Sequence, residues 1–191
     1  DPFCGCGTFP IEAAMIAANI APGMNRSFLS EEWDNLIPKK LWYDTVDEAT
    51  EMIDDDIEVD IQGYDIDPEV LRAARENAKE AGVDHLIHFQ QRAVKDLRHP
   101  KKYGFIITNP PYGERLSQDK DVLHLYQDMG TALKHQFSGA TAWVISSNED
   151  ALKCIGLRPA KKIHLVNGDL ECLFNKYELF KGDRKTWKKS L

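Results

Sequence analysis

Long apolar runs and closely spaced metal-ligand residues are both missing from this 191-residue sequence. No run approaches the roughly 18–20 consecutive apolar residues of a membrane-spanning helix, so we expect no membrane insertion. The four cysteines include no Cys-x-x-Cys pair and the six histidines show no His-x-x-x-His spacing, so we expect no metal site. The cysteines are interpreted as reduced packing thiols of a cytoplasmic protein.

A strong positive field is missing too, because the formal net charge is −7. Residues 31–60 hold twelve acids and two lysines, a net −10, which leaves +3 for the rest of the chain. We interpret the acidic run as solvated surface. Residues 181–189 carry five basic side chains against one acid, which is either solvated surface or a contact to phosphates. Neither run provides the strong positive electrostatic potential that is expected of a domain that binds RNA on its own.

Apolar periodicity predicts strands that alternate with helices. Helices are expected after Pro10, over about 38–53, from the Asp67 cap and Pro68 to Gly82, around 122–133, and over 149–154. Strands are expected over 57–64, 86–90, 105–108 and 142–145. Such alternation predicts right-handed βαβ units and a parallel sheet.

The end of the chain departs from that alternation. Two β-rich runs, 162–166 and 170–180, are separated by Asn167-Gly168-Asp169, a strong signal for an antiparallel hairpin. A mostly parallel sheet that ends in an antiparallel C-terminal hairpin is typical of the Rossmann-like, S-adenosylmethionine-dependent methyltransferase fold, an α/β class. We expect residues 1–191 to be one such catalytic domain, with an insertion at about 24–60. Because the chain opens on a loop that normally follows a strand, we also expect a first strand to precede it.

Three segments carry candidate chemistry. The first runs from Asp1 to Thr8, where Gly5 and Gly7 allow a close backbone approach at a strand-to-helix turn. Asp1 suits the ammonium group of S-adenosylmethionine, and loop amides suit its carboxylate. The Gly-x-Gly pattern alone is weak, because ordinary tight turns use the same residues.

The second segment is Gly63 to Pro68. Asp65 ends a predicted strand, where ribose hydroxyls need a bidentate acceptor. Ile66 suits the adenine face. Asp67 is more simply interpreted as the helix cap.

The third segment, Thr108-Asn109-Pro110-Pro111-Tyr112-Gly113, is the most specific. The two prolines force an extended, stiff bend after a buried strand. The Asn109 side-chain oxygen and the Pro110 carbonyl can then hold the two hydrogens of one amino group, and Tyr112 offers a ring for stacking a base. A rigid turn with a surface tyrosine is the simpler alternative.

With these segments the chain resembles the methyltransferase domain of bacterial THUMP-containing 23S rRNA guanine-N2 methyltransferases. The resemblance covers nearly the whole chain and includes DPFCGCGT, GYDIDPEVLRAARENAKEAGV, ITNPPYGERL and NGDLECLFNKYELFKG. It implies direct methyl transfer from S-adenosylmethionine to a guanine N2 amine, with ribosomal RNA held by an upstream THUMP domain. The implied cofactor residues are Asp1, Gly5, Gly7 and Asp65, and the implied base-holding residues are Asn109, Pro110 and Tyr112.

Two positions depart from the family pattern. Cys6 stands where a serine is common, a small change in volume. Ala93 stands where an aspartate often meets the adenine amino group, so that contact is either absent or made by Asp96. The alternatives left open by the sequence are adenine N6, a tRNA guanine, a glutamine amide, and a non-catalytic RNA-binding module.

Overall fold

The computed structural model describes residues 1–24, 26–98, 104–113 and 119–180. Its helices are α1 (Thr8–Ala17), α2 (Lys39–Glu51), α3 (Pro68–Glu80), α4 (Asp119–Gln136) and α5 (Glu149–Cys154). Its strands are β1 (Ile61–Asp65), β2 (Ile87–Gln91), β3 (Phe105–Thr108), β4 (Thr141–Ser146), β5 (Lys161–Asn167) and β6 (Leu170–Glu178). Short 3₁₀ turns span Leu29–Glu32, Asp84–Leu86 and Val94–Asp96. In the described ranges no helix is both long and apolar enough to cross a bilayer.

The strands form two sheets whose parallel part comes first along the chain. β1 pairs in parallel with β2, and β3 pairs in parallel with β4. β6 then lies antiparallel between β4 and β5, which gives the order β3-β4-β6-β5. The expected α/β class, with parallel strands and an antiparallel C-terminal hairpin, is confirmed.

The residues that open the chain lie between the two sheets. The Tyr64 amide donates to the Asp1 carbonyl at 2.8 Å, and the Cys4 amide donates to the Tyr64 carbonyl at 2.9 Å. On the other side, the Thr108 hydroxyl of β3 donates to the Asp1 carboxylate at 2.6 Å. The carboxyl ends of β1 and β3 are therefore held beside the same short segment.

Local sequence explains most element boundaries. Asp67 caps α3, because its carboxylate accepts from the Glu69 amide at 2.9 Å, and Pro68 occupies the first turn. Gly82 follows α3 with a φ of +76°, a left-handed conformation that favours glycine. The turn that joins β5 and β6 contains Gly168 with a φ of +63°, as the hairpin prediction requires.

Two predicted strands have wrong boundaries. The strand predicted over 57–64 begins only at Ile61, because Ile61 is the first residue with a partner, Ile87 of β2. The strand predicted to reach Phe180 ends at Glu178. Leu179 instead exchanges backbone hydrogen bonds with Gly139 and Ala140 in the turn before β4.

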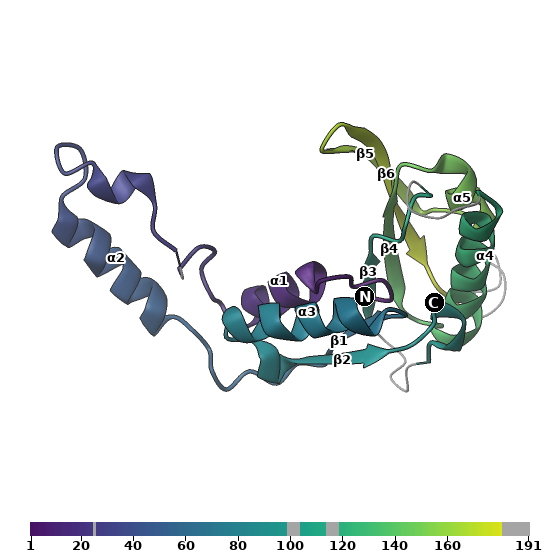
Figure 1. Ribbon diagram of the computed structural model, residues 1–191, viewed down its shortest axis with the longest axis horizontal. Coiled ribbons are helices and arrows are strands. Elements are labelled where there is room, and N and C mark those ends of the chain that lie inside the picture. The colour runs from purple at the N-terminus through teal and green to yellow at the C-terminus, as the bar shows by residue number, and fades with distance from the viewer. Residues whose placement is uncertain (25, 99–103, 114–118, 181–191) are drawn as a thin grey trace.

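Two apolar clusters make up the core. One packs α1 and α3 against β1 and β2, and it includes Leu71 and Phe89. The other packs α4 and α5 against β3, β4 and β6, and its largest fully buried side chains are Tyr126 and Tyr177. Figure 1 shows the two groups side by side, with the N-terminal residues described above between them.

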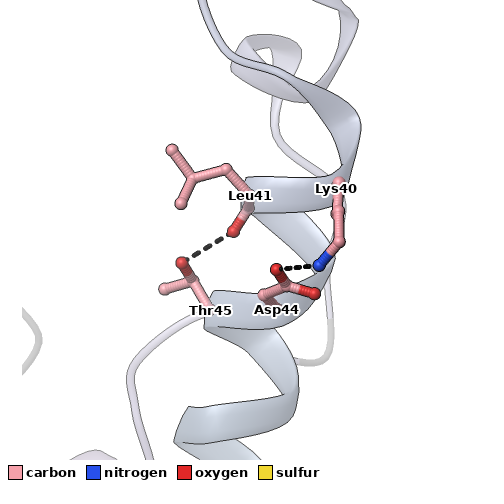
Figure 2. Close-up of polar contacts among 4 residues, drawn as sticks. All are labelled: Lys40, Leu41, Asp44 and Thr45. Carbon is pink, nitrogen blue, oxygen red and sulfur yellow. Dashed lines mark hydrogen bonds and ion pairs between the residues drawn. The ribbon is translucent and has the colours of Figure 1, made fainter.

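Residues 26–60, here called the arm, extend away from this body (Figure 1). No residue of the arm is buried. Helix α2 is supported by contacts within one turn of itself, shown in Figure 2: Lys40 pairs with Asp44 at 2.6 Å, and the Thr45 hydroxyl donates to the Leu41 carbonyl at 2.8 Å. The arm therefore adds nothing to the core, and its interpretation as an insertion stays a prediction.

Candidate active site

Three loops meet at the carboxyl ends of β1 and β3: a glycine loop (residues 1–8), an acidic loop (65–67) and a proline loop (109–113). Asp1 joins the first to the third. One of its carboxylate oxygens accepts from the Phe3 amide at 3.0 Å and from the fully buried Thr108 hydroxyl at 2.6 Å. This oxygen therefore fixes the loop, and the second carboxylate oxygen takes no part in these two bonds.

Asp65 joins the glycine loop to the acidic loop. One oxygen of its half-buried carboxylate accepts from the Gly5 amide at 3.1 Å, and the other accepts from the Asp67 amide at 3.1 Å. A carboxylate has about four acceptor positions, so roughly two remain for a ligand. Ile66 follows directly and is 68% exposed, although it is apolar.

The two glycines of the loop have different surroundings. Gly5 has a φ of +53°, and a Cβ atom placed there would meet nothing within 4 Å. Gly7 has a φ of +93°, and a Cβ atom there would meet Ala74, Ile11 and Phe89 at 3.1–3.2 Å. Gly5 therefore borders open space, whereas Gly7 lets α1 pack closely on α3 and β2.

The cysteines of the glycine loop also differ. Burial raises the pKa of the Cys4 thiol to about 12, and the negative charge of Asp65 adds to the effect. Cys4 is therefore a neutral packing group. Cys6 is exposed, and its carbonyl accepts from the Asn77 side chain of α3 at 2.9 Å. Asn77 was missed from the sequence, because a polar residue on a helix surface gives no signal of its own.

Ala93 and Asp96 lie just after β2. Ala93 is half-buried and precedes the 3₁₀ turn, and the Asp96 amide donates to the Ala93 carbonyl at 3.0 Å. The Asp96 side chain is exposed. Which of the two residues meets an adenine amino group remains a prediction.

In the proline loop, a buried proline separates two accessible polar side chains. Pro110 is fully buried, Asn109 is exposed, and Tyr112 is half-buried. The Tyr112 hydroxyl donates to the Asn109 side-chain oxygen. The Tyr112 carbonyl accepts from the side chain of Asn148, which caps α5, at 3.0 Å. Asn148 is a second residue that sequence reasoning missed.

The ring of Tyr112 also lies near the β5–β6 hairpin. Burial raises the pKa of its hydroxyl and the neighbouring Cys172 thiol adds to the rise, while the hydrogen-bond partners Asn167 and Asn109 oppose it. The hydroxyl therefore stays protonated and remains a hydrogen-bond donor. Hence the hairpin, predicted only as a fold feature, also lines the proline loop.

The basic run 181–189, expected to be either solvated surface or a contact to phosphates, lies outside the described residues. Within the described ranges, no three His, Cys, Asp or Glu side chains are grouped as metal ligands would be.

The fold and the three loops define a methyltransferase of the S-adenosylmethionine-dependent class. The family described as "RMKL-like, methyltransferase domain" matches residues 1–176, and the chain belongs to that family. This confirms the family expected from the sequence, and with it the cofactor expected at the level of the family.

Curated relatives support the assignment. The chain is 42% identical over 177 residues to "Putative RNA methyltransferase YpsC" of Bacillus subtilis (strain 168), covering 93% of this chain and 46% of that protein. It is 38% identical over 182 residues to "Ribosomal RNA large subunit methyltransferase K/L" of Shewanella oneidensis, covering 94% of this chain and 26% of that protein. The chain therefore spans half or less of the length of these relatives.

Two solved structures show the same fold. One is the crystal structure of SMU.472, described as "a putative methyltransferase complexed with SAH", with a TM-score of 0.89 at 38% identity, covering 96% of this chain and 48% of that one. The other, from Listeria monocytogenes str. 4b F2365, is described as "a predicted N6-adenine-specific DNA methylase", with a TM-score of 0.83 at 40% identity, covering 94% of this chain and 46% of that one.

Proposed function

We propose that this domain transfers a methyl group from S-adenosylmethionine to the exocyclic N2 amine of a guanine in 23S ribosomal RNA. The observation that carries the proposal is the bond between Tyr112 and Asn109, which holds an accessible amide oxygen beside an aromatic ring directly after β3. S-adenosylmethionine, when bound, supplies a methyl group already activated on a sulfonium sulfur. The chain's own residues therefore need to bind the cofactor and the target base and to orient them, more than to transfer protons.

The residues of the first two loops fit such a cofactor. Asp65 keeps acceptor capacity for the two ribose hydroxyls, and Gly5 beside it borders open space. Exposed Ile66 offers an apolar surface for the adenine face, and Ala93 or Asp96 would meet its amino group. Asp1 and the amides of the glycine loop, with Gly7 at its end, would hold the ammonium and carboxylate groups.

The proline loop fits an amino group on a planar base. An amide oxygen accepts two hydrogen bonds, so Asn109 can bind the target amine while it still accepts from Tyr112. The Pro110 carbonyl would accept the second hydrogen of the same amine. Together they draw electron density onto the nitrogen and aim its lone pair, and the Tyr112 ring stacks on the base. No side chain is assigned as a general base, because the nitrogen becomes strongly acidic once it carries the methyl group and can release its proton to water.

The choice of guanine N2 rests on relatives and on the extent of the resemblance. The Shewanella relative is named for large-subunit ribosomal RNA, which supports an RNA substrate in the cytoplasm. The second candidate is adenine N6, which the name of the Listeria structure favours. Both amines present two N–H donors beside a ring, so the loop geometry fits either. Because the residues outside the acidic run sum to only +3, we further propose that an upstream THUMP domain binds the RNA.

The test is to incubate the full-length gene product with radiolabelled S-adenosylmethionine and unmodified large-subunit ribosomal RNA, and then to digest the RNA to nucleosides. The expected result is label in N2-methylguanosine. Label in N6-methyladenosine, or label only when transfer RNA is the substrate, would overturn the target while leaving the fold and cofactor unaffected. Binding of RNA with no label in any nucleoside would support a non-catalytic module instead.

A further inference from the structure

Asn148 uses both ends of its side-chain amide. Its oxygen accepts from the Ala151 amide at 2.9 Å and so caps α5. Its nitrogen donates to the Tyr112 carbonyl at 3.0 Å, across 36 residues of sequence. The cap explains the residue type only in part, because serine or aspartate would cap a helix equally well, and neither of them brings an amide donor.

Asn148 is itself held by the core. Its backbone amide donates to the Ser146 hydroxyl at 3.1 Å. Ser146 is fully buried at the end of β4 and shares a hydrogen bond of 2.8 Å with the hydroxyl of Tyr126, which is also fully buried on α4. The donor that reaches the proline loop is therefore fixed to the best-packed part of the molecule.

Tyr112 connects this donor to the candidate catalytic amide. Its carbonyl is held by Asn148, and its hydroxyl holds the Asn109 oxygen. The two prolines between Asn109 and Tyr112 leave the loop little freedom to absorb a shift at one end. A change at Asn148 should therefore alter the position of Asn109, because Tyr112 is hydrogen-bonded to both residues.

We propose that Asn148 is a positioning residue, which sets the orientation of Tyr112 and Asn109 toward the target amine. The proposal rests on the proposed function of the proline loop. It assigns to the helix cap after β4 a role in turnover that is separate from its role in stability.

The experiment compares Asn148→Ser and Asn148→Asp with the wild type in the full-length protein. Both variants keep a capping oxygen and lose the donor to Tyr112. With saturating unmodified large-subunit rRNA, we expect kcat to fall about tenfold, the effect of one hydrogen bond. The dissociation constant for S-adenosylmethionine should stay at its wild-type value, and the melting temperature should fall only by the few degrees that one lost hydrogen bond costs.

The aspartate variant adds a readout that a purely structural role would not produce. A protonated carboxyl group can donate to the Tyr112 carbonyl, whereas an ionised one repels it. The activity of Asn148→Asp relative to the wild type should therefore rise as the pH is lowered, whereas that of Asn148→Ser should stay flat. An identical pH profile for the two variants would contradict the proposal.

Asn109→Ala, measured in parallel, separates the two hypotheses. If Asn109→Ala is inactive while both Asn148 variants turn over at the wild-type rate, the positioning role alone is overturned. A loss of S-adenosylmethionine binding together with a lower melting temperature in both Asn148 variants would also overturn it. If Asn109→Ala is active, the proposed function of the loop fails, and the positioning role fails with it.

Discussion

Asp65→Ala should weaken S-adenosylmethionine binding without unfolding the domain. The wild-type carboxylate accepts from the Gly5 and Asp67 amides at 3.1 Å each, and by our proposal it also accepts from ribose hydroxyls. Hydrogen bonds to a charged group contribute about 1.5–3 kcal/mol. At about 1.4 kcal/mol per decade, the dissociation constant should rise roughly tenfold to a hundredfold.

Asp67→Ala is the matched control. It also removes a carboxylate, only two residues away, but one that caps a helix and is not proposed to contact the cofactor. Asp67 caps α3 through the Glu69 amide at 2.9 Å, so its loss should cost about 0.5–2 kcal/mol of stability. For a domain of this size that corresponds to a melting temperature lower by about 1–8 °C. Its cofactor affinity should stay unchanged.

Isothermal titration calorimetry gives the dissociation constants, and differential scanning calorimetry gives the melting temperatures. The two variants should differ, with affinity for S-adenosylmethionine lost in Asp65→Ala and stability lost in Asp67→Ala. An unchanged dissociation constant for Asp65→Ala would remove that residue from the cofactor site. Equal losses of affinity in both variants would mean that the acidic loop acts through its fold alone.

Three further predictions concern the base, the thiols and the RNA. Asn109→Ala should abolish methyl transfer while calorimetric affinity for S-adenosylmethionine largely survives; turnover near the wild-type rate at saturating RNA would contradict the assigned role. Iodoacetamide at pH 8 should modify Cys6 and spare Cys4, because a buried thiol with a pKa of about 12 is ionised in only roughly one molecule in ten thousand; comparable labelling by mass spectrometry would refute this. Residues 1–191 alone should methylate rRNA with a lower kcat/KM than the full-length protein, and added salt should shrink the difference; equal values on protein-free rRNA would show that no further RNA-binding domain is needed.

The parts of the structure that were predictable are those with a local cause. Alternating strands and helices, the Asp67 cap and the Asn167-Gly168 turn each follow from residues a few positions apart, and all are confirmed. The positions of the three loops after β1, after β3 and before α1 follow in the same way from strand ends.

The contacts that complete the site were not predictable, because they join residues far apart in sequence. The bond from Asn148 to Tyr112 depends on where α5 begins relative to the proline loop. The packing of Gly7 against Phe89 depends on how α1 crosses β2. Strand lengths were wrong for a similar reason: β1 begins only where β2 offers a partner. Such outcomes depend on tertiary geometry, which apolar periodicity does not encode.

The arm changes how the charge of this protein should be interpreted. It contains the whole acidic run of residues 31–60, and Figure 1 places α2 at the opposite end of the molecule from β4 and α5. A helix of 13 residues is about 20 Å long, more than twice the screening length of about 8 Å at physiological ionic strength. The charges at the start of α2 lie one helix length farther from the body than those at its end and are therefore strongly screened, whereas Asp60 directly precedes β1, where burial raises the pKa of Tyr64 and the charge of Asp60 adds to the rise. The residues outside the acidic run 31–60 sum to +3, and mutations that neutralise α2 should leave the rate at which RNA reaches the site almost unaffected at physiological salt.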